Sequence, residues 1–260
     1  MTKQSGRVRS DLTFRMLDFR QNVSILKNTS LQDRLISESI TLAKENGFEG
    51  VVLDLEVSAL PFASLLEQIS SFNKRFYTAS HKADLHYAVT LYGDTFYRIR
   101  PFEVTALGKN SDEVMIMAYD LHKSRGSPGP NFPLRGKETY GYDYASLIDH
   151  FSEAVPPEKL TVIFGLFGYD WTVDNKQNML AHGEPLSLNK IKQDFISECA
   201  FSSCLQKRDS LSAESSISYT DTEGAKHLVW FEDMDSVAKK QEFLQTKGIA
   251  SFSFWAYSYF

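Results

Sequence analysis

The sequence predicts an α/β fold, and the architecture it favours is a (β/α) barrel of the TIM type. Apolar runs typical of buried strands alternate with segments of helical spacing, which indicates a parallel sheet covered by helices. Polar and aromatic side chains gather where these strands end, and in a barrel those ends meet on the face that carries the active site. An open doubly wound sheet is the alternative, but the glycine-rich phosphate loop that usually follows its first strand is missing from the sequence.

The first half of the chain shows this alternation in order. Residues 12–19 predict a strand. Residues 31–47 predict a helix because their apolar positions have helical spacing, with Ser30 as the candidate cap before it and Gly47 as its end. The elements that follow are the buried strand 51–56, the amphipathic helix 62–80, and the strands 85–93 and 114–122. Segment 123–136 is rich in Gly and Pro, so it is ordered only if something packs on it.

The second half predicts fewer core strands than a closed barrel needs. Its elements are a helix at 143–159, a strand at 160–171 that runs into a loop, a helix at 186–199, a β-hairpin at 216–233 with its turn near Glu223–Gly224, a helix at 236–248 and a last strand at 249–260. We therefore expect about six core strands in a single domain over 11–260, with an insertion at about 172–233. Residues 1–10 are expected to form a disordered tail.

The composition argues against several partners. The chain has 28 Lys and Arg against 33 Asp and Glu, a net charge of -5 and no basic block, so nucleic acid is not an expected partner. The sequence has no run of 18 apolar residues, the length that predicts a membrane span, and no signal peptide is visible. Cys199 and Cys204 are too isolated for a zinc site. Because a helix would point their side chains apart, we expect free thiols.

Two acidic residues end the otherwise apolar stretch 47-GFEGVVLDLE-56. Side chains alternate along a strand, so Val52, Asp54 and Glu56 share one face. Carboxylates about 6–7 Å apart in a partly dry site push their pKa values apart, so that one stays ionised and the other can serve as a general acid. The alternative is structural, because acids at strand ends often cap the next helix or pair with a lysine.

Several stretches together resemble glycoside hydrolase family 18, which contains chitinase and peptidoglycan-hydrolase barrels. GFEGVVLDLE is similar to the fourth-strand signature D-G-x-D-x-D-x-E, with Asp54 and Glu56 at its last two acidic positions. MIMAYDLH resembles the sixth-strand element M-x-Y-D, and GLFGYDW resembles the seventh-strand segment of the spore-cortex type. The closing region, HLVWFEDMDSVAKKQEFL and GIASFSFWAY, resembles that subgroup as well. The likeness runs from about residue 12 to the C-terminus.

The resemblance implies a retaining hydrolase of β-1,4 bonds in N-acetylhexosamine glycans, peptidoglycan or chitin-like, that works by substrate-assisted catalysis. It implies Glu56 as the general acid, Asp54 as the group that orients the substrate acetamide, and Tyr119 as a donor to the acetamido oxygen. Substrate-binding roles are implied for Met117, Asp120, Tyr169, Trp171 and Trp255, the last as the floor beneath the sugar. The partner is then a glycan that contains N-acetylglucosamine, with no metal or cofactor, and an extracellular or cell-envelope location is suggested.

Two departures from the family pattern keep alternatives open. Val52 stands where many members have an Asp that shares a proton with the next Asp. In addition, two β/α units of the family barrel have no counterpart before the strand at 12–19, so the barrel is expected to be N-terminally incomplete. The alternative function is a non-catalytic, lectin-like barrel that binds carbohydrate. A tryptophan such as Trp255, taken alone, is more often a core residue than a ligand floor, and Tyr169 and Trp171 could pack the loop after their strand.

Overall fold

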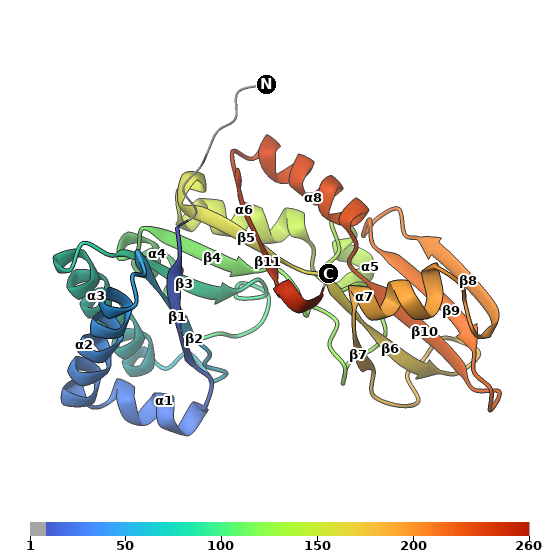
Figure 1. Ribbon diagram of the computed structural model, residues 1–260, viewed down its shortest axis with the longest axis horizontal. Coiled ribbons are helices and arrows are strands. Elements are labelled where there is room, and N and C mark those ends of the chain that lie inside the picture. The colour runs from blue at the N-terminus through green and yellow to red at the C-terminus, as the bar shows by residue number, and fades with distance from the viewer. Residues whose placement is uncertain (1–8, 260) are drawn as a thin grey trace. The chain divides into compact units, whose positions relative to one another are not determined.

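The computed structural model describes residues 9–259, and the chain divides into two compact units (Figure 1). The first unit is made of the residues up to 91, 98–115 and 154–160, and the second of 92–97, 116–153 and the residues from 161 onward. Most of the tail predicted over 1–10 lies outside the described residues. The single domain predicted over 11–260 stays a prediction.

Parallel strands form the sheet of the first unit, in the order β1 (Asp11–Met16), β2 (Gly50–Leu55) and β3 (His86–Tyr92). Every residue of β2 is buried, as its apolar run predicts. Gly50 fits the entry of β2 because an added Cβ would lie 2.9 Å from the carbonyl oxygen of His86 on β3. The absence of a side chain at Gly50 therefore lets β2 lie close to β3 just before the acid pair.

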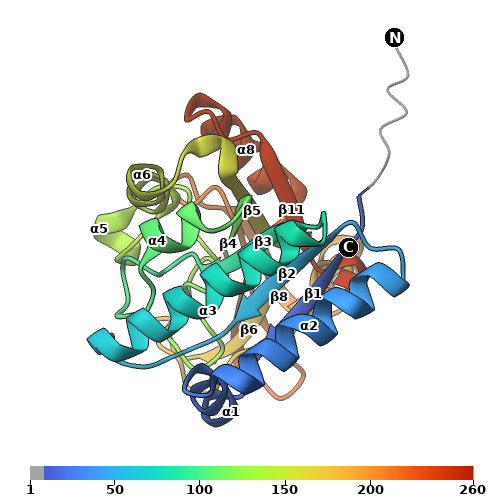
Figure 2. The same ribbon diagram turned by 90° about the vertical axis from the view of Figure 1, so that its left-hand side faces the viewer.

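Helices α1 (Phe19–Leu26), α2 (Thr29–Glu45) and α3 (Ala63–Lys82) pack beside these strands, as Figure 2 shows for α2 and α3. Each of the two long helices buries one apolar face: the buried apolar residues are Ile36 and Ala43 on α2, and Leu65, Ile69, Phe72 and Phe76 on α3. The first unit also holds α4 (Val104–Lys109) and the 3-10 turn η1 (Pro157–Lys159). The helices predicted at 31–47 and 62–80 are therefore present, with shifted ends.

The start of α2 differs from the prediction. Asn28, not Ser30, is the cap, because its side chain accepts a hydrogen bond from the Leu31 N–H at 3.1 Å. The short helix α1 was not predicted, and its cap is Asp18, whose side chain accepts from the Gln21 N–H. At the other end, Gly47 has a φ of 72° in the turn that follows α2, which explains the glycine there.

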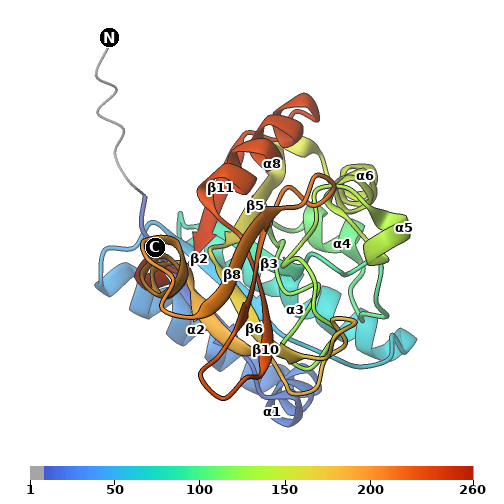
Figure 3. The ribbon, with the colours of Figure 1, turned by 90° about the vertical axis from the view of Figure 1, so that its right-hand side faces the viewer.

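In the second unit, β5 (Leu160–Gly165) pairs in parallel with β11 (Ser251–Trp255), and β4 (Glu113–Met117) enters this unit from the first. The core strands β1 to β5 and β11 agree with the expected number of six for the described part of the chain. The other elements of this region are α5 (Lys137–Tyr140), α6 (Tyr144–Ala154), α8 (Met234–Thr246) and the 3-10 turn η3 (Tyr257–Tyr259) (Figure 3). Trp255 ends β11, so the residue expected as a sugar floor lies at a strand terminus.

A five-stranded antiparallel sheet makes up the rest of the second unit, in the order β7-β6-β10-β9-β8. Its strands are β6 (Phe167–Val173), β7 (Glu184–Ser187), β8 (Ser202–Arg208), β9 (Ser215–Thr220) and β10 (Lys226–Phe231). The predicted hairpin at 216–233 is confirmed as β9 and β10, with Gly224 at a φ of 86° in the turn. The strand predicted at 160–171 is wrong as one element, because the chain leaves β5 after Gly165 and begins the antiparallel β6 at Phe167.

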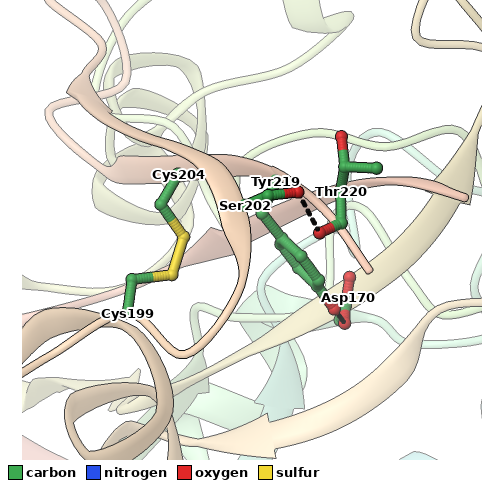
Figure 4. Close-up of a disulfide and its surroundings, with 6 residues drawn as sticks. All are labelled: Asp170, Cys199, Ser202, Cys204, Tyr219 and Thr220. Carbon is green, nitrogen blue, oxygen red and sulfur yellow. Dashed lines mark hydrogen bonds between the residues drawn. A yellow bond between two sulfur atoms is a disulfide. The ribbon is translucent and has the colours of Figure 1, made fainter. Parts of the chain in front are cut away.

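The prediction of free thiols is wrong, because Cys199 and Cys204 form a disulfide (Figure 4). The helix predicted at 186–199 is instead β7, the short α7 (Leu188–Ile191) and a π-helical turn, η2 (Lys192–Ile196). The chain then turns into β8, which brings the two Cα atoms to 6.5 Å. Beside the disulfide, the Ser202 hydroxyl donates to the Thr220 carbonyl on β9.

Among the described helices, none has the length and apolar character that a membrane crossing needs.

Candidate active site

The first unit places both expected acids at the carboxyl end of β2. Asp54 lies within the strand and is 5% exposed, and Glu56 follows it with a partly exposed side chain. Both carboxylate oxygens of Asp54 are bonded. The Thr90 hydroxyl on β3 donates to one at 2.6 Å, and Arg15 Nε on β1 donates to the other at 3.0 Å. Three adjacent strands therefore fix the orientation of this carboxylate.

Arg15 was not among the predicted site residues. It lies opposite Asp54 in the register of β1 and β2, and its guanidinium Nη2 is 3.7 Å from Glu56 Oε1. The acids were expected to act chiefly on each other, whereas the structure places one cation beside both. The structural alternative was that the acids pair with a lysine. Such a pairing is present, but its basic residue is Arg15. A lone arginine inside the apolar stretch LTFRM was the available signal.

The backbone of Glu56 is also fixed. The Glu56 N–H donates to the Met16 carbonyl at 3.0 Å. The buried side chain of Asn22 on α1 donates to the carbonyls of Met16 at 2.8 Å and of Glu56 at 3.0 Å. Helix α1 therefore ties the ends of β1 and β2 together at the position of the acid. Asn22 is thus a buried polar side chain with its hydrogen-bonding partners present.

The second unit contains a pocket of about 390 Å³ with aromatic and acidic walls. It is lined by Tyr119, Asp120, Phe167, Tyr169, Pro185, Leu186, Ser187, Trp255 and Tyr259. The rings of Tyr119 and Trp255 are stacked at 6.5 Å between centroids, with 25° between their planes. Trp255 is 36% exposed, which leaves part of its indole face available. An aromatic wall beside polar groups suits the apolar face and the hydroxyls of a sugar.

Asp120 and Tyr169 are joined inside this pocket. The Tyr169 hydroxyl donates to Asp120 Oδ1 at 2.8 Å. Burial, and then the charge of Asp120, raise the pKa of Tyr169 well above its ordinary value, so the phenol keeps its proton. Asp120 has a left-handed backbone conformation, with a φ of 61°, that few non-glycine residues adopt. Tyr119, expected as a donor to the acetamido oxygen, thus lines one cavity with the expected binding residues Asp120, Tyr169 and Trp255.

Two expected binding residues lie elsewhere. Trp171 is 0% exposed and packs with Val173 and Leu228 in the core of the antiparallel sheet, where its indole N–H donates to the Ser124 carbonyl. A substrate contact does not fit a side chain without exposed surface, so we assign Trp171 a packing role. The strand predicted at 160–171 puts Trp171 at its end, whereas in the structure Trp171 lies within the antiparallel strand β6. Met117 is buried and does not line the pocket either.

In the described part of the chain, no cluster of His, Cys, Asp or Glu could hold a metal ion. The first unit offers the partly exposed carboxyl group of Glu56 beside the fixed carboxylate of Asp54, and the second unit offers an aromatic pocket with a phenol and a carboxylate. A carboxyl pair can protonate a leaving oxygen and stabilise positive charge, and such a pocket can hold a sugar ring. These features agree with the class that the sequence motifs predict, the glycoside hydrolases built on β/α barrels.

The comparison with known families makes this assignment specific. The sequence model of the family "Glycosyl hydrolases family 18" matches residues 20–259. The chain therefore belongs to glycosyl hydrolase family 18, as the ordered motifs at 47–56, 115–122 and 165–171 predicted.

Individual relatives are distant. The cortical fragment-lytic enzyme of Bacillus subtilis is 24% identical over 241 residues, which cover 89% of this chain and 51% of that protein, so the chain spans about half the length of this relative. The structure of a chitinase from Cycas revoluta in complex with (GlcNAc)3 has a TM-score of 0.81 at 22% identity, covering 96% of this chain and 76% of that one. The group IV chitinase of Ostrinia furnacalis gives a TM-score of 0.83 at 16% identity, with 97% and 73% covered. These structures show that the fold is that of family 18 barrels.

Proposed function

We propose that the protein is a retaining glycoside hydrolase that cleaves β-1,4 bonds of N-acetylhexosamine glycans by substrate-assisted catalysis. The observation that carries the proposal is the acid pair of β2. Asp54 is bonded at both oxygens, and Glu56 keeps a partly exposed carboxyl next to it. Membership of family 18 and the aromatic pocket around Tyr119 support it. The names of two relatives, a cortical fragment-lytic enzyme and a chitinase, favour a peptidoglycan or chitin-like glycan.

In the proposed first step, Glu56 gives its proton to the glycosidic oxygen while the bond from that oxygen to the anomeric carbon breaks. The acetamido oxygen of the substrate attacks the same carbon and forms an oxazolinium ion. Asp54 accepts a hydrogen bond from the acetamido N–H and offsets the positive charge that develops there. The Tyr119 hydroxyl donates to the acetamido oxygen and keeps it in line for attack.

In the second step, a water molecule attacks the anomeric carbon and gives a proton to Glu56, which restores the acid and regenerates the acetamido group. Thr90 and Arg15 prepare Asp54 for its role, because they fix its carboxylate before substrate arrives. Asp120 and Tyr169 bind sugar hydroxyls from the pocket wall, and Trp255 supports the apolar face of the ring.

A non-catalytic, carbohydrate-binding barrel is the second candidate. Two observations favour it: Val52 replaces an acidic residue of the family signature, and Arg15 lies 3.7 Å from the carboxyl of Glu56. An ion pair with Arg15 is a structural role for Glu56 that needs no proton transfer. Incubation of the intact protein with a chromogenic N-acetylglucosamine oligomer separates the two. Release of the reporter supports hydrolysis, and saturable binding without release supports the second candidate.

The substitution Trp255→Ala is expected to weaken binding of an N-acetylglucosamine oligomer by about tenfold or more, because it removes the aromatic surface of the pocket. Isothermal titration calorimetry with the oligomer measures the change in Kd. Trp255→Phe is the matched control, since it keeps a flat apolar ring and is expected to retain most of the affinity. Equal affinity of Trp255→Ala and the unsubstituted protein would contradict the role of Trp255 as the sugar floor.

A further inference from the structure

The backbone of Asp120 is held by the side chain of a buried asparagine. The Asp120 N–H donates to Asn131 Oδ1 at 2.7 Å. The amide Nδ2 of Asn131 donates to the carbonyls of Gly165 at 3.0 Å and of Phe167 at 3.4 Å, where β5 ends and β6 begins. Asn131 is 2% exposed. A single amide therefore ties the left-handed residue Asp120 to the strand ends beneath the pocket.

Asn131 is itself held by a buried carboxylate. The N–H groups of Asn131 and Phe132 donate to the two oxygens of Glu214, at 2.5 and 2.8 Å. Lys240 on α8 donates to Glu214 Oε1 at 2.7 Å and to both oxygens of Glu232. Glu214, Lys240 and Glu232 are each 0% exposed. Such a buried, fully bonded network is rigid, because moving one member leaves charged or polar partners unsatisfied.

The segment between Asp120 and Asn131 has no helix or strand of its own. It is rich in Gly and Pro, so its path depends on contacts with other parts of the chain. Ser124 bonds Gly183 and Trp171 in the middle of the segment, and Asn131 bonds Asp120 at its start. The Leu121 N–H also donates to the Asn131 carbonyl, at 2.8 Å. Asp120, which lines the pocket, and the residue that follows it are thus bonded to the same asparagine.

We propose that Asn131 is a positioning residue that fixes Asp120 for glycan binding, and that Glu214, held by Lys240, fixes Asn131 in turn. The inference deepens the proposed function, since it rests on Asp120 as a binding residue of the same pocket. Asn131 acts through Asp120 and does not itself line the pocket. Its effect on catalysis should therefore vanish when Asp120 can no longer bind.

A double-mutant cycle tests this coupling. Asn131→Ala is expected to lower kcat/KM on the chromogenic oligomer by about 10- to 100-fold, and Asp120→Ala to lower it at least as much. The double variant should be no worse than Asp120→Ala alone, within about twofold. Asn73→Ala is the matched control, because Asn73 is also buried and bonds backbone carbonyls, but in the first unit. Its effect should multiply with that of Asp120→Ala, and a multiplicative result for Asn131→Ala would overturn the proposal.

Asn131→Asp gives a second test that does not depend on the alanine variant folding. The amide has two N–H donors and bonds two carbonyls. A protonated aspartic acid keeps the acceptor for the Asp120 N–H and one O–H donor for the nearer carbonyl of Gly165, whereas the ionised form faces both carbonyls without a proton to donate. Burial raises the pKa of such a group. The activity of Asn131→Asp relative to the unsubstituted protein should therefore be highest at acidic pH and fall as the pH rises. A constant ratio across pH would count against the proposal.

If the unsubstituted protein releases no reporter, the proposed function fails. The positioning role of Asn131 is then decided by an experiment that needs no substrate. Amide hydrogen exchange followed by NMR reports the bond from Asp120 to Asn131 directly. In Asn131→Ala the Asp120 N–H should exchange at least about tenfold faster. The Gly93 N–H, which donates to the Met117 carbonyl, should keep its rate and serves as the internal control. An unchanged rate at Asp120 would overturn the inference.

Discussion

Glu56→Gln is expected to lower kcat on a chromogenic N-acetylglucosamine oligomer by about 10²- to 10⁴-fold, the usual contribution of a general acid. Glutamine keeps the size and shape of the side chain, but its amide cannot give a proton to the glycosidic oxygen. The backbone anchors of this position, from Met16 and Asn22, do not involve the side chain and should persist. The rate is measured by reporter release at saturating substrate.

Binding should survive this substitution, because the proposed sugar contacts come mainly from the pocket around Trp255. Titration calorimetry with the oligomer should give a Kd within about threefold of the unsubstituted protein. Glu67→Gln makes the same change at an exposed position on α3 and should leave both quantities unaltered. Equal activity in Glu56→Gln would rule out Glu56 as the acid. Inactivity of both proteins with binding retained would favour the carbohydrate-binding alternative.

The parallel strands and their helices could be predicted because their signals are local. The stretch 51–55 is apolar except for Asp54, and the helices at 31–47 and 62–80 have the period of an amphipathic helix. The acids of β2 and the residues Tyr119 and Trp255 could be identified because they end such strands within recognisable motifs. Strand alternation also predicted that the acids share a face, and Arg15 lies beside both of them, at 3.0 Å from Asp54 Oδ2 and 3.7 Å from Glu56 Oε1.

The features that could not be predicted from the sequence depend on contacts between residues that are far apart in the chain. Arg15 is 39 residues from Asp54, and Asn131 is 83 residues from Glu214. Only the strand register and the path of the loop bring these pairs together. Residues 160–171 are apolar on both sides of Gly165, so no local signal marks the change from the parallel to the antiparallel sheet. The burial of Trp171 and the disulfide at Cys199 follow from that same change of sheet and from the turn into β8.

Lys240→Met is expected to cost about 3–5 kcal/mol of the free energy of unfolding, the usual cost of breaking a buried ion pair from one side. Lys240 is the cation that faces the carboxylates of Glu214 and Glu232, and all three side chains are fully buried. Burial alone would lower the pKa of Lys240, but the two carboxylates outweigh it and raise this pKa. Lys240 Nζ also lies 4.9 Å from the ring centre of Tyr144, a cation–π contact that methionine cannot replace.

The neighbouring residue provides the control. Lys239 is exposed on the same turn of α8, so Lys239→Met should change stability by no more than about 0.5 kcal/mol. Urea unfolding of the three proteins at one pH gives the comparison. Equal stability of the two variants would contradict the view that this buried charge cluster depends on Lys240.

The pH dependence of unfolding gives the loss of stability in Lys240→Met a distinct signature. In the unsubstituted protein, burial is the largest influence on Glu232 and raises its pKa to about 8, from an ordinary value of 4.5. A raised carboxyl pKa means that the folded state binds a proton more tightly than the unfolded state, so this stabilisation is complete below about pH 4.5 and is lost as the pH rises towards 8. The charge and hydrogen bonds of Lys240 lower the pKa of Glu232, so removal of Lys240 should raise this pKa further. The stability of Lys240→Met should therefore fall more steeply with rising pH than that of the unsubstituted protein. Parallel pH profiles would instead mean that water or a rearranged side chain replaces the cation.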